Sequence, residues 1–225
     1  MSLFADFLPI WEDGMKLRCR RWGMVIDGEN DGTQMIIEHI VQFNQFVDVA
    51  LSLLAPYFRR ECISLDEKLI MSCALYHDNG EIGGDVMEPK KTDEDDLKEY
   101  LSFERSIQNL PQRIQNEKEK SFFLQFALKE DTSIFPFYTQ GIIQELRTNK
   151  AVEAQVFKSL EKFEYLYYPY FVRDRDPDLL PLVISRHMPS YQRYAEKIPG
   201  YREVLFTEQL EAWMNSVLAE NVLVK

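Results

Sequence analysis

Apolar residues recur along this chain at the three- and four-residue spacing of amphipathic helices, and no strand pattern is longer than chance allows. The clearest repeat predicts one long helix over residues 33–57. The predicted buried face of this helix consists of Ile36, Ile40, Phe43, Val47, Ala50, Leu51 and Leu54. His39 directly precedes Ile40, so its side chain lies at the border of that face, where a buried ligand can face a cavity.

A second amphipathic helix is predicted to begin near residue 64, because Ser64 and Glu67 have the interval of a capping box. Asn79-Gly80 and then a second glycine pair at 83–84 break the helical pattern. His77 and Asp78 therefore fall at the C-terminal end of an apolar helix, where the backbone geometry is well fixed. The predicted buried face of this helix consists of Leu69, Ile70, Cys73, Ala74 and His77.

The remaining chain is also predicted to be helical. Thr92 and the acidic residues after it indicate a helix start, and residues 93–128 are predicted to form one or two helices. Residues 140–168 are predicted as one long helical stretch, followed by a charged loop at 173–178 and short elements. A last helix is predicted near residues 207–221. The fold class predicted from these patterns is all-α.

Composition narrows the class of protein. A chain of 225 residues with 45% hydrophobic and 13% aromatic residues is long and apolar enough for one globular domain, alone or with an extension. The net charge of −11 argues against nucleic acid as a partner, because nucleic-acid binding depends on basic residues that neutralise phosphates. No apolar run approaches 18 residues, and no signal-peptide pattern begins the chain. Cys19, Cys62 and Cys73 form no spaced framework, so we expect reduced thiols and a soluble, cytoplasmic protein without a membrane partner.

Two of the three histidines mark the candidate chemistry. His39 is followed 38 residues later by the pair His77-Asp78, and imidazole with carboxylate is a donor set for a divalent metal ion. Such mixed ligands suit Mn, Co, Fe or Ni better than structural zinc, although zinc stays possible. For each histidine alone, the alternative is a hydrogen-bonded core residue. His187 lies apart from this pattern and is predicted to have a surface or capping role.

The residues around these histidines carry a resemblance to a known family. Arg21-Trp22, Glu38-His39, His77-Asp78, Glu81 and Gly84-Asp85 resemble, in this order, the motifs of the HD-domain superfamily of metal-dependent phosphohydrolases. Within it they resemble the bacterial 5′-deoxynucleotidases and their eukaryotic relatives. The resemblance spans roughly residues 15–168. It implies an HD-type helical bundle over residues 1–168, with a helical extension at 169–225 packed on that core.

The resemblance also implies which residues bind the metal ion and act on the substrate. His39, His77 and Asp78 correspond to metal ligands, and Glu161 falls where the family has a fourth ligand, an Asp. A Glu reaches one methylene further and can still bind, and the alternative is that Glu161 is a solvent-side helix residue. Glu81 corresponds to the residue that orients the attacking water, so Glu81 and Asp78 are the predicted catalytic residues; the alternative for Glu81 is a solvated acidic residue of a loop.

Three more positions correspond to substrate contacts. Arg21 resembles the phosphate-binding arginine, with a generic basic helix face as the alternative. Trp22 resembles the residue that crowds the C2′ position of the sugar, and Asp85 resembles the residue that bonds a sugar hydroxyl. Asp85 follows Glu81 by four residues, where relatives usually have five, which puts the reach of Asp85 in doubt.

The function implied by the resemblance is hydrolysis of the 5′-phosphate of (deoxy)nucleoside monophosphates, with one divalent metal ion as cofactor. One alternative is a catalytically weak HD protein that binds a nucleotide or a protein partner. Another is an HD phosphohydrolase that acts on a different phosphorylated metabolite. Relatives are commonly dimers, so the resemblance also implies a homodimer.

Overall fold

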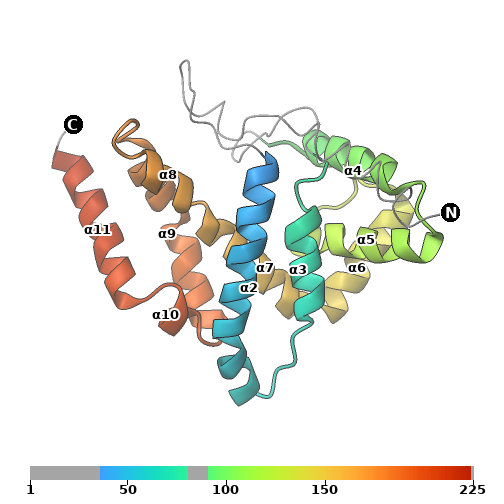
Figure 1. Cartoon of the computed structure of the whole chain (residues 1–225), viewed down its shortest axis with the longest axis horizontal. Coiled ribbons are helices and arrows are strands. Elements are labelled where there is room, and N and C mark those ends of the chain that lie inside the picture. Colours follow the sequence, from blue (N-terminus) through green and yellow to red (C-terminus); the bar gives the residue numbers. More distant parts are fainter. Residues whose placement is uncertain (1–35, 81–90, 224–225) are drawn as a thin grey trace. The chain divides into compact units, whose positions relative to one another are not determined.

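The fold of the chain is helical throughout the residues that the computed structural model describes, 36–80 and 91–223, in which no strand occurs. This confirms the predicted all-α class. Figure 1 shows the course of the chain. The helices are α2 (Ile36–Arg60), α3 (Glu67–Tyr76), α4 (Asp93–Ile107), α5 (Gln112–Phe123), the short 3-10 helix η1 (Leu124–Phe126), α6 (Phe137–Asn149), α7 (Ala151–Glu164), α8 (Tyr167–Val172), α9 (Leu179–Lys197), α10 (Tyr201–Val204) and α11 (Glu208–Leu223).

The chain divides into two compact units. The first unit comprises residues 1–44 and 68–154, and the second comprises residues 45–67 and 155–225. The helices α2 and α7 each begin in the first unit and end in the second. The resemblance implies an HD-type core that ends at residue 168. This boundary stays a prediction.

Aromatic rings form the core of the first unit. Phe103 of α4 and Phe122 of α5 are fully buried and stack with ring centroids 4.3 Å apart. Phe123, Phe126 and Phe135 pack edge-to-face or tilted beside them. Such ring pairs add to the stabilisation that burial of their area already gives. The cluster fixes α4, α5 and η1 against one another.

The helix starts in this unit follow local chemistry. The side chain of Thr92 accepts a hydrogen bond from the Asp95 amide, and the Asp95 carboxylate accepts one from the Thr92 amide, which completes a capping box. This confirms the helix start predicted at Thr92. Pro111 and Pro136 directly precede α5 and α6, where a missing backbone donor costs nothing.

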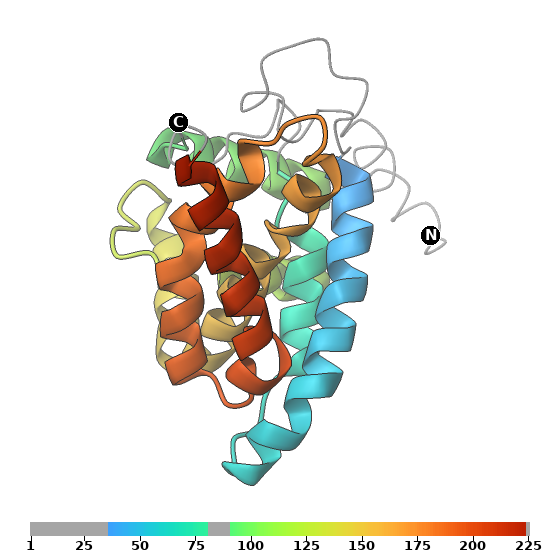
Figure 2. The same cartoon turned by 90° about the vertical axis from the view of Figure 1, so that its left-hand side faces the viewer.

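The second unit is organised around α9. Helices α8, α10 and α11 all contact α9, and Figure 2 shows α11 running beside it. The hydroxyl of Tyr191 on α9 donates to the Lys162 carbonyl of α7 at 2.8 Å. Gly200 precedes α10 with φ +78°, and a Cβ there would lie 2.4 Å from the Tyr57 ring, so this turn requires glycine.

Several helix boundaries differ from the sequence-based expectation. The stretch 140–168 is not continuous, because the backbone leaves the helical region at Lys150, which separates α6 from α7, and α7 ends at Glu164. The prediction of short elements after residue 178 was wrong, since α9 has 19 residues and accommodates Pro189 in its interior. Helix α3 begins at Glu67, so Asp66, rather than Ser64, directly precedes it.

Among the described helices, none has the length and apolar character needed to cross a membrane.

The aromatic cluster predicts a large stability difference between two phenylalanine substitutions. Phe103→Ala should lower the free energy of unfolding by about 3–5 kcal/mol, because it leaves a cavity beside Phe122. Phe137→Ala should change it by less than about 0.5 kcal/mol, because the Phe137 side chain is 90% exposed. Urea unfolding of both variants checks this, and an equal loss in the two would contradict the assigned core.

Candidate metal centre

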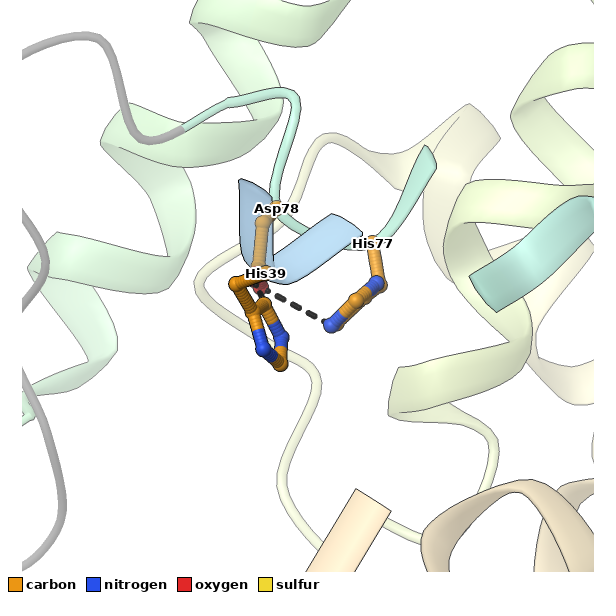
Figure 3. Close-up of side chains that lie close together, drawn as sticks. All are labelled: His39, His77 and Asp78. Atoms are coloured by element: carbon orange, nitrogen blue, oxygen red, sulfur yellow. Dashed lines mark ion pairs between the residues drawn. The ribbon is translucent and has the colours of Figure 1, made fainter. Parts of the chain in front are cut away.

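Three of the predicted ligands come together in the first unit. His39 lies in the first turns of α2, His77 directly follows the last residue of α3, and Asp78 lies in the turn after it. Figure 3 shows the three side chains converging on one point. Each residue is at least 94% buried, with exposed fractions of 1%, 2% and 6%. The structure therefore confirms that residues far apart in sequence form one buried cluster.

The Asp78 carboxylate lies between the two imidazole rings. Its Oδ2 is 3.2 Å from Nε2 of His39, and its Oδ1 is 3.2 Å from Nε2 of His77. The two imidazole ring centroids are 5.6 Å apart, with an interplanar angle of 67°. Both histidines thus direct the same ring nitrogen toward the carboxylate.

The histidine rings are held by their own surroundings. Phe43, one turn after His39 on α2, stacks on the His39 ring at 5.7 Å and contacts the His77 ring at 5.0 Å. Nδ1 of His77 lies 3.0 Å from the Ala74 carbonyl. A carbonyl oxygen only accepts, so Nδ1 carries a proton, and Nε2 is the nitrogen that a neutral ring in this orientation would offer to a metal ion. That is the tautomer that a metal ligand at Nε2 requires.

The donor set fits a divalent metal ion. One ligand atom from each of His39, His77 and Asp78 lies within 4.8 Å of the other two. Ligand atoms about 2.1 Å from one ion are at most about 4.2 Å apart, so small side-chain movements bring all three into a common coordination sphere. Two imidazoles and one carboxylate form a mixed set that suits transition metals. This group could therefore hold one metal ion.

The turn that carries Asp78 packs tightly against α4. A Cβ added at Gly80 would lie 2.2 Å from the Glu99 carbonyl oxygen and 2.7 Å from its Cα. Only glycine permits this approach, so Gly80 brings the backbone after Asp78 into contact with the middle of α4. The close packing also places the Glu99 carboxylate within the electrostatic field of Asp78.

Glu99 and Asp96 are buried and pair with two partly exposed lysines. Nζ of Lys91 is 2.7 Å from the Glu99 carboxylate and 3.5 Å from that of Asp96. Nζ of Lys129 is 2.8 Å from the other oxygen of Asp96. Burial raises the pKa of the Glu99 carboxyl to about 7; Lys91 opposes the shift, and the charges of Asp96 and Asp78 add to it. The charges of Glu99 and Asp96, on the helix that the turn after α3 approaches, are thus paired with lysines.

Glu161, the predicted fourth ligand, lies on α7 in the second unit. Glu161 is only 8% exposed, so the alternative of a solvent-side position was wrong. Its carboxylate accepts a hydrogen bond from Nζ of Lys158 at 2.7 Å, one turn earlier on the same helix. A buried carboxylate needs such a partner or a metal ion. Ligation by Glu161 stays a prediction.

The other predicted site residues lie outside the described part of the chain. These are the phosphate-binding and sugar-contacting candidates Arg21, Trp22 and Asp85, and the water-orienting candidate Glu81. Their roles stay predictions from the resemblance. The expectation for His187 was wrong, because its ring is buried on α9, 5.3 Å from the Tyr165 ring and 6.3 Å from the Tyr191 ring.

Two residues near the cluster were not identified from the sequence. Glu99 is one of several acidic residues on α4, and nothing in their spacing distinguishes it. Gln125 is the polar residue within the buried run from Phe122 to Phe126, and its amide donates to the His77 carbonyl at 3.0 Å. A lone amide inside an apolar run needs a buried partner, and this signal was available from the sequence.

In comparisons with known proteins, no family model, curated protein or solved structure matches the chain.

The cluster predicts metal binding that depends on its three residues. Wild-type protein should retain one divalent ion after dialysis, and His39→Ala/His77→Ala should lose it, because both nitrogen donors are removed. The matched control is His187→Ala, which removes the remaining histidine without touching the cluster. Elemental analysis and titration with Mn²⁺, Co²⁺, Ni²⁺ and Zn²⁺ measure the difference. Wild-type metal content in the double variant would remove these histidines from the proposed site.

The burial of Glu99 predicts a pH-dependent stability difference. With a folded-state pKa of about 7 against an ordinary 4.5, the folded protein binds more protons than the unfolded chain between these values. The contribution of Glu99 to stability is thus fully present below pH 4.5 and is lost as the pH rises through about 7.

Glu99→Gln removes this titration, so the free energy of unfolding of the variant relative to wild type should rise across that interval. The rise should be at most about 3–4 kcal/mol, at about 1.4 kcal/mol per pKa unit. Denaturant titrations of metal-free protein at several pH values measure it. The control is Glu94→Gln, the same substitution at an exposed position on the same helix. A pH-independent difference for Glu99→Gln would contradict the raised pKa.

Proposed function

We propose that this protein is a divalent-metal-dependent phosphomonoesterase that removes the 5′-phosphate of (deoxy)nucleoside monophosphates. The observation that supports this proposal is the buried cluster of His39, His77 and Asp78. The cluster has the residue types and the chain order that carry the resemblance to HD-domain phosphohydrolases. Its donor set also leaves coordination positions open for a water and a phosphate oxygen.

Each residue of the cluster has a distinct part in this reaction. His39 and His77 contribute neutral donors, and the hydrogen bond between the His77 ring and the Ala74 carbonyl keeps Nε2 available. Asp78 contributes the negative charge that offsets part of the charge of the ion. When bound, the ion polarises a phosphoryl oxygen and lowers the pKa of a coordinated water towards neutrality. Glu81 is proposed to orient that water and to accept its proton.

Glu161 is proposed as the fourth ligand. Support comes from its place in the sequence and from its burial, since a buried carboxylate needs a cationic partner. The ammonium of Lys158 fills that role in the structure. Ligation by Glu161 therefore requires Lys158 to share the carboxylate with the ion or to release it.

Substrate recognition is proposed from the resemblance. Arg21 binds the phosphate through its guanidinium group, Trp22 excludes a 2′-hydroxyl, and Asp85 bonds the sugar. A guanidinium group matches the geometry of phosphate oxygens and forms paired hydrogen bonds with them. The proposed assembly is a homodimer in the cytoplasm.

A second candidate function is an HD-type protein that binds a nucleotide with little or no turnover. The ion pair between Lys158 and Glu161 favours it, because a carboxylate already neutralised by a lysine is a weaker ligand. In that case three protein ligands would hold the ion, and hydrolysis would be slow.

The test is a phosphate-release screen on metal-loaded protein. Substrates are the deoxynucleoside and ribonucleoside monophosphates, a phosphodiester, and a set of other phosphorylated metabolites. We expect release from the nucleoside monophosphates, faster for the deoxy forms. Asp78→Asn should lower the rate at least about 100-fold, because the metal contributes several kcal/mol to transition-state stabilisation.

The matched control is Asp48→Asn, the same substitution at an exposed position on α2, which should keep the wild-type rate. Release from other phosphorylated compounds alone would shift the proposal to a different substrate class. Nucleotide binding without release in any assay would instead support the non-catalytic candidate. A rate that Asp78→Asn leaves unchanged would contradict both the metal centre and the activity.

Metal affinities of Glu161→Gln and Glu161→Asp test whether Glu161 is the fourth ligand. Weaker metal binding in Glu161→Gln, with binding retained in Glu161→Asp, indicates that Glu161 is a ligand. Wild-type metal affinity in both variants indicates three protein ligands.

A further inference from the structure

Gln125 links η1 to the candidate metal centre. Its side-chain Nε2 donates a hydrogen bond of 3.0 Å to the backbone carbonyl of His77, which is 48 residues earlier in the chain. Both residues are buried, with exposed fractions of 6% and 2%. The His77 carbonyl lies directly after the end of α3 at Tyr76, and Gln125 donates to it from η1.

The bond acts on the peptide group between two proposed ligands. The His77 carbonyl and the Asp78 amide belong to one rigid plane, so a group that fixes the carbonyl direction also fixes the orientation of that plane. The plane in turn determines how the His77 and Asp78 side chains leave the backbone. Their ligand atoms, Nε2 and Oδ1, are 3.2 Å apart, so a small rotation of the plane changes their relative position.

Gln125 is itself fixed by packing. It belongs to η1, between the buried residues Leu124 and Phe126. Phe126 contacts the rings of Phe122 and Phe135, which anchors η1 in the aromatic core of the first unit. The amide donor is therefore held in place by a rigid part of the fold.

We propose that Gln125 is a positioning residue of the metal centre, which orients the peptide between His77 and Asp78 and thereby sets the geometry of both ligands. This inference rests on the proposed metal centre, and it goes beyond the ligands that the resemblance supplies. Residues that orient metal ligands through hydrogen bonds typically contribute about 10- to 100-fold in metal affinity. We expect a contribution of that size from Gln125.

The alternative is that the Gln125 hydrogen bond only stabilises the packing of η1 against the end of α3. A hydrogen bond of the same kind occurs between α2 and α3, where the Asn44 side-chain amide donates to the Met71 carbonyl at 3.0 Å. Such a hydrogen bond contributes to stability and has no specific effect on the arrangement of the ligands.

The experiment compares Gln125→Met with Gln140→Met in the full-length chain. Both substitutions replace a glutamine amide by a side chain of the same length without a donor. The Gln140 amide donates to the Phe135 carbonyl at 2.8 Å, so its removal breaks the same kind of bond at a residue that is not a proposed ligand. Gln125→Asn, which keeps an amide but shortens its reach, serves as a second variant if Gln125→Met does not fold.

The main readouts are the affinity for Co²⁺, from competition with a chelator, and the visible absorption spectrum of the Co²⁺ form. Gln125→Met should bind Co²⁺ about 10- to 100-fold more weakly and shift the absorption bands, while Gln140→Met should match wild type in both. The denaturation midpoints of the metal-free variants show whether the two substitutions are comparable in their structural effect. Unchanged Co²⁺ affinity and spectrum in folded Gln125→Met would overturn the proposal, as would an equal loss in Gln140→Met.

A measurement on metal-free protein separates this inference from the proposed function. Nitrogen NMR of the His77 ring and of the Asp78 amide should show shifts in Gln125→Met and none in Gln140→Met. Wild-type protein that binds Co²⁺ but releases no phosphate would contradict the proposed activity and leave the role of Gln125 intact. Wild-type protein without Co²⁺ affinity would contradict the metal centre and overturn the positioning role with it, whatever the NMR result.

Discussion

The burial of the Asp78 carboxylate imposes the strongest physical constraint on the first unit. A carboxylate removed from water needs cationic or hydrogen-bonding partners, and without them its charge is strongly disfavoured. In this protein its partners include two imidazole rings, each 3.2 Å from one oxygen of the carboxylate. A divalent cation bound among the three groups would offset the charge of the carboxylate, and these residues could hold one.

The rest of the first unit maintains this arrangement from several directions. Helix α2 carries His39 and the Phe43 ring that packs on both histidines. Gly80 allows the turn after Asp78 to approach α4, and the aromatic core fixes η1 where Gln125 reaches the His77 carbonyl. These contacts are made by parts of the chain that lie up to 86 residues from one another, between His39 and Gln125. The geometry of the cluster is thus a property of the whole unit.

Each of the two units contains lysine–carboxylate ion pairs. Around Glu99, Lys91 and Lys129 pair with the buried carboxylates of Glu99 and Asp96, and Lys129 also pairs with the exposed carboxylate of Asp93. On α7, Lys158 and Glu161 form a pair within a single helix, one turn apart. Both arrangements pair a carboxylate with an ammonium group. At Asp78 the partners include two imidazole rings, which are donors that transition metals bind.

The sequence by itself determined the all-α class, the start of α4 at Thr92, and the three clustered residues His39, His77 and Asp78. These features depend on local periodicity, on capping chemistry and on residue types that are rare in this chain. The break at Lys150, the length of α9 and the burial of His187 and Glu161 were decided by tertiary packing, which overrides local preference. The hydrogen bond from Gln125 to His77 and the approach of Gly80 to Glu99 also arise only in the folded unit. Sequence spacing describes one helix at a time, whereas these contacts join helices whose mutual placement depends on how the aromatic core packs.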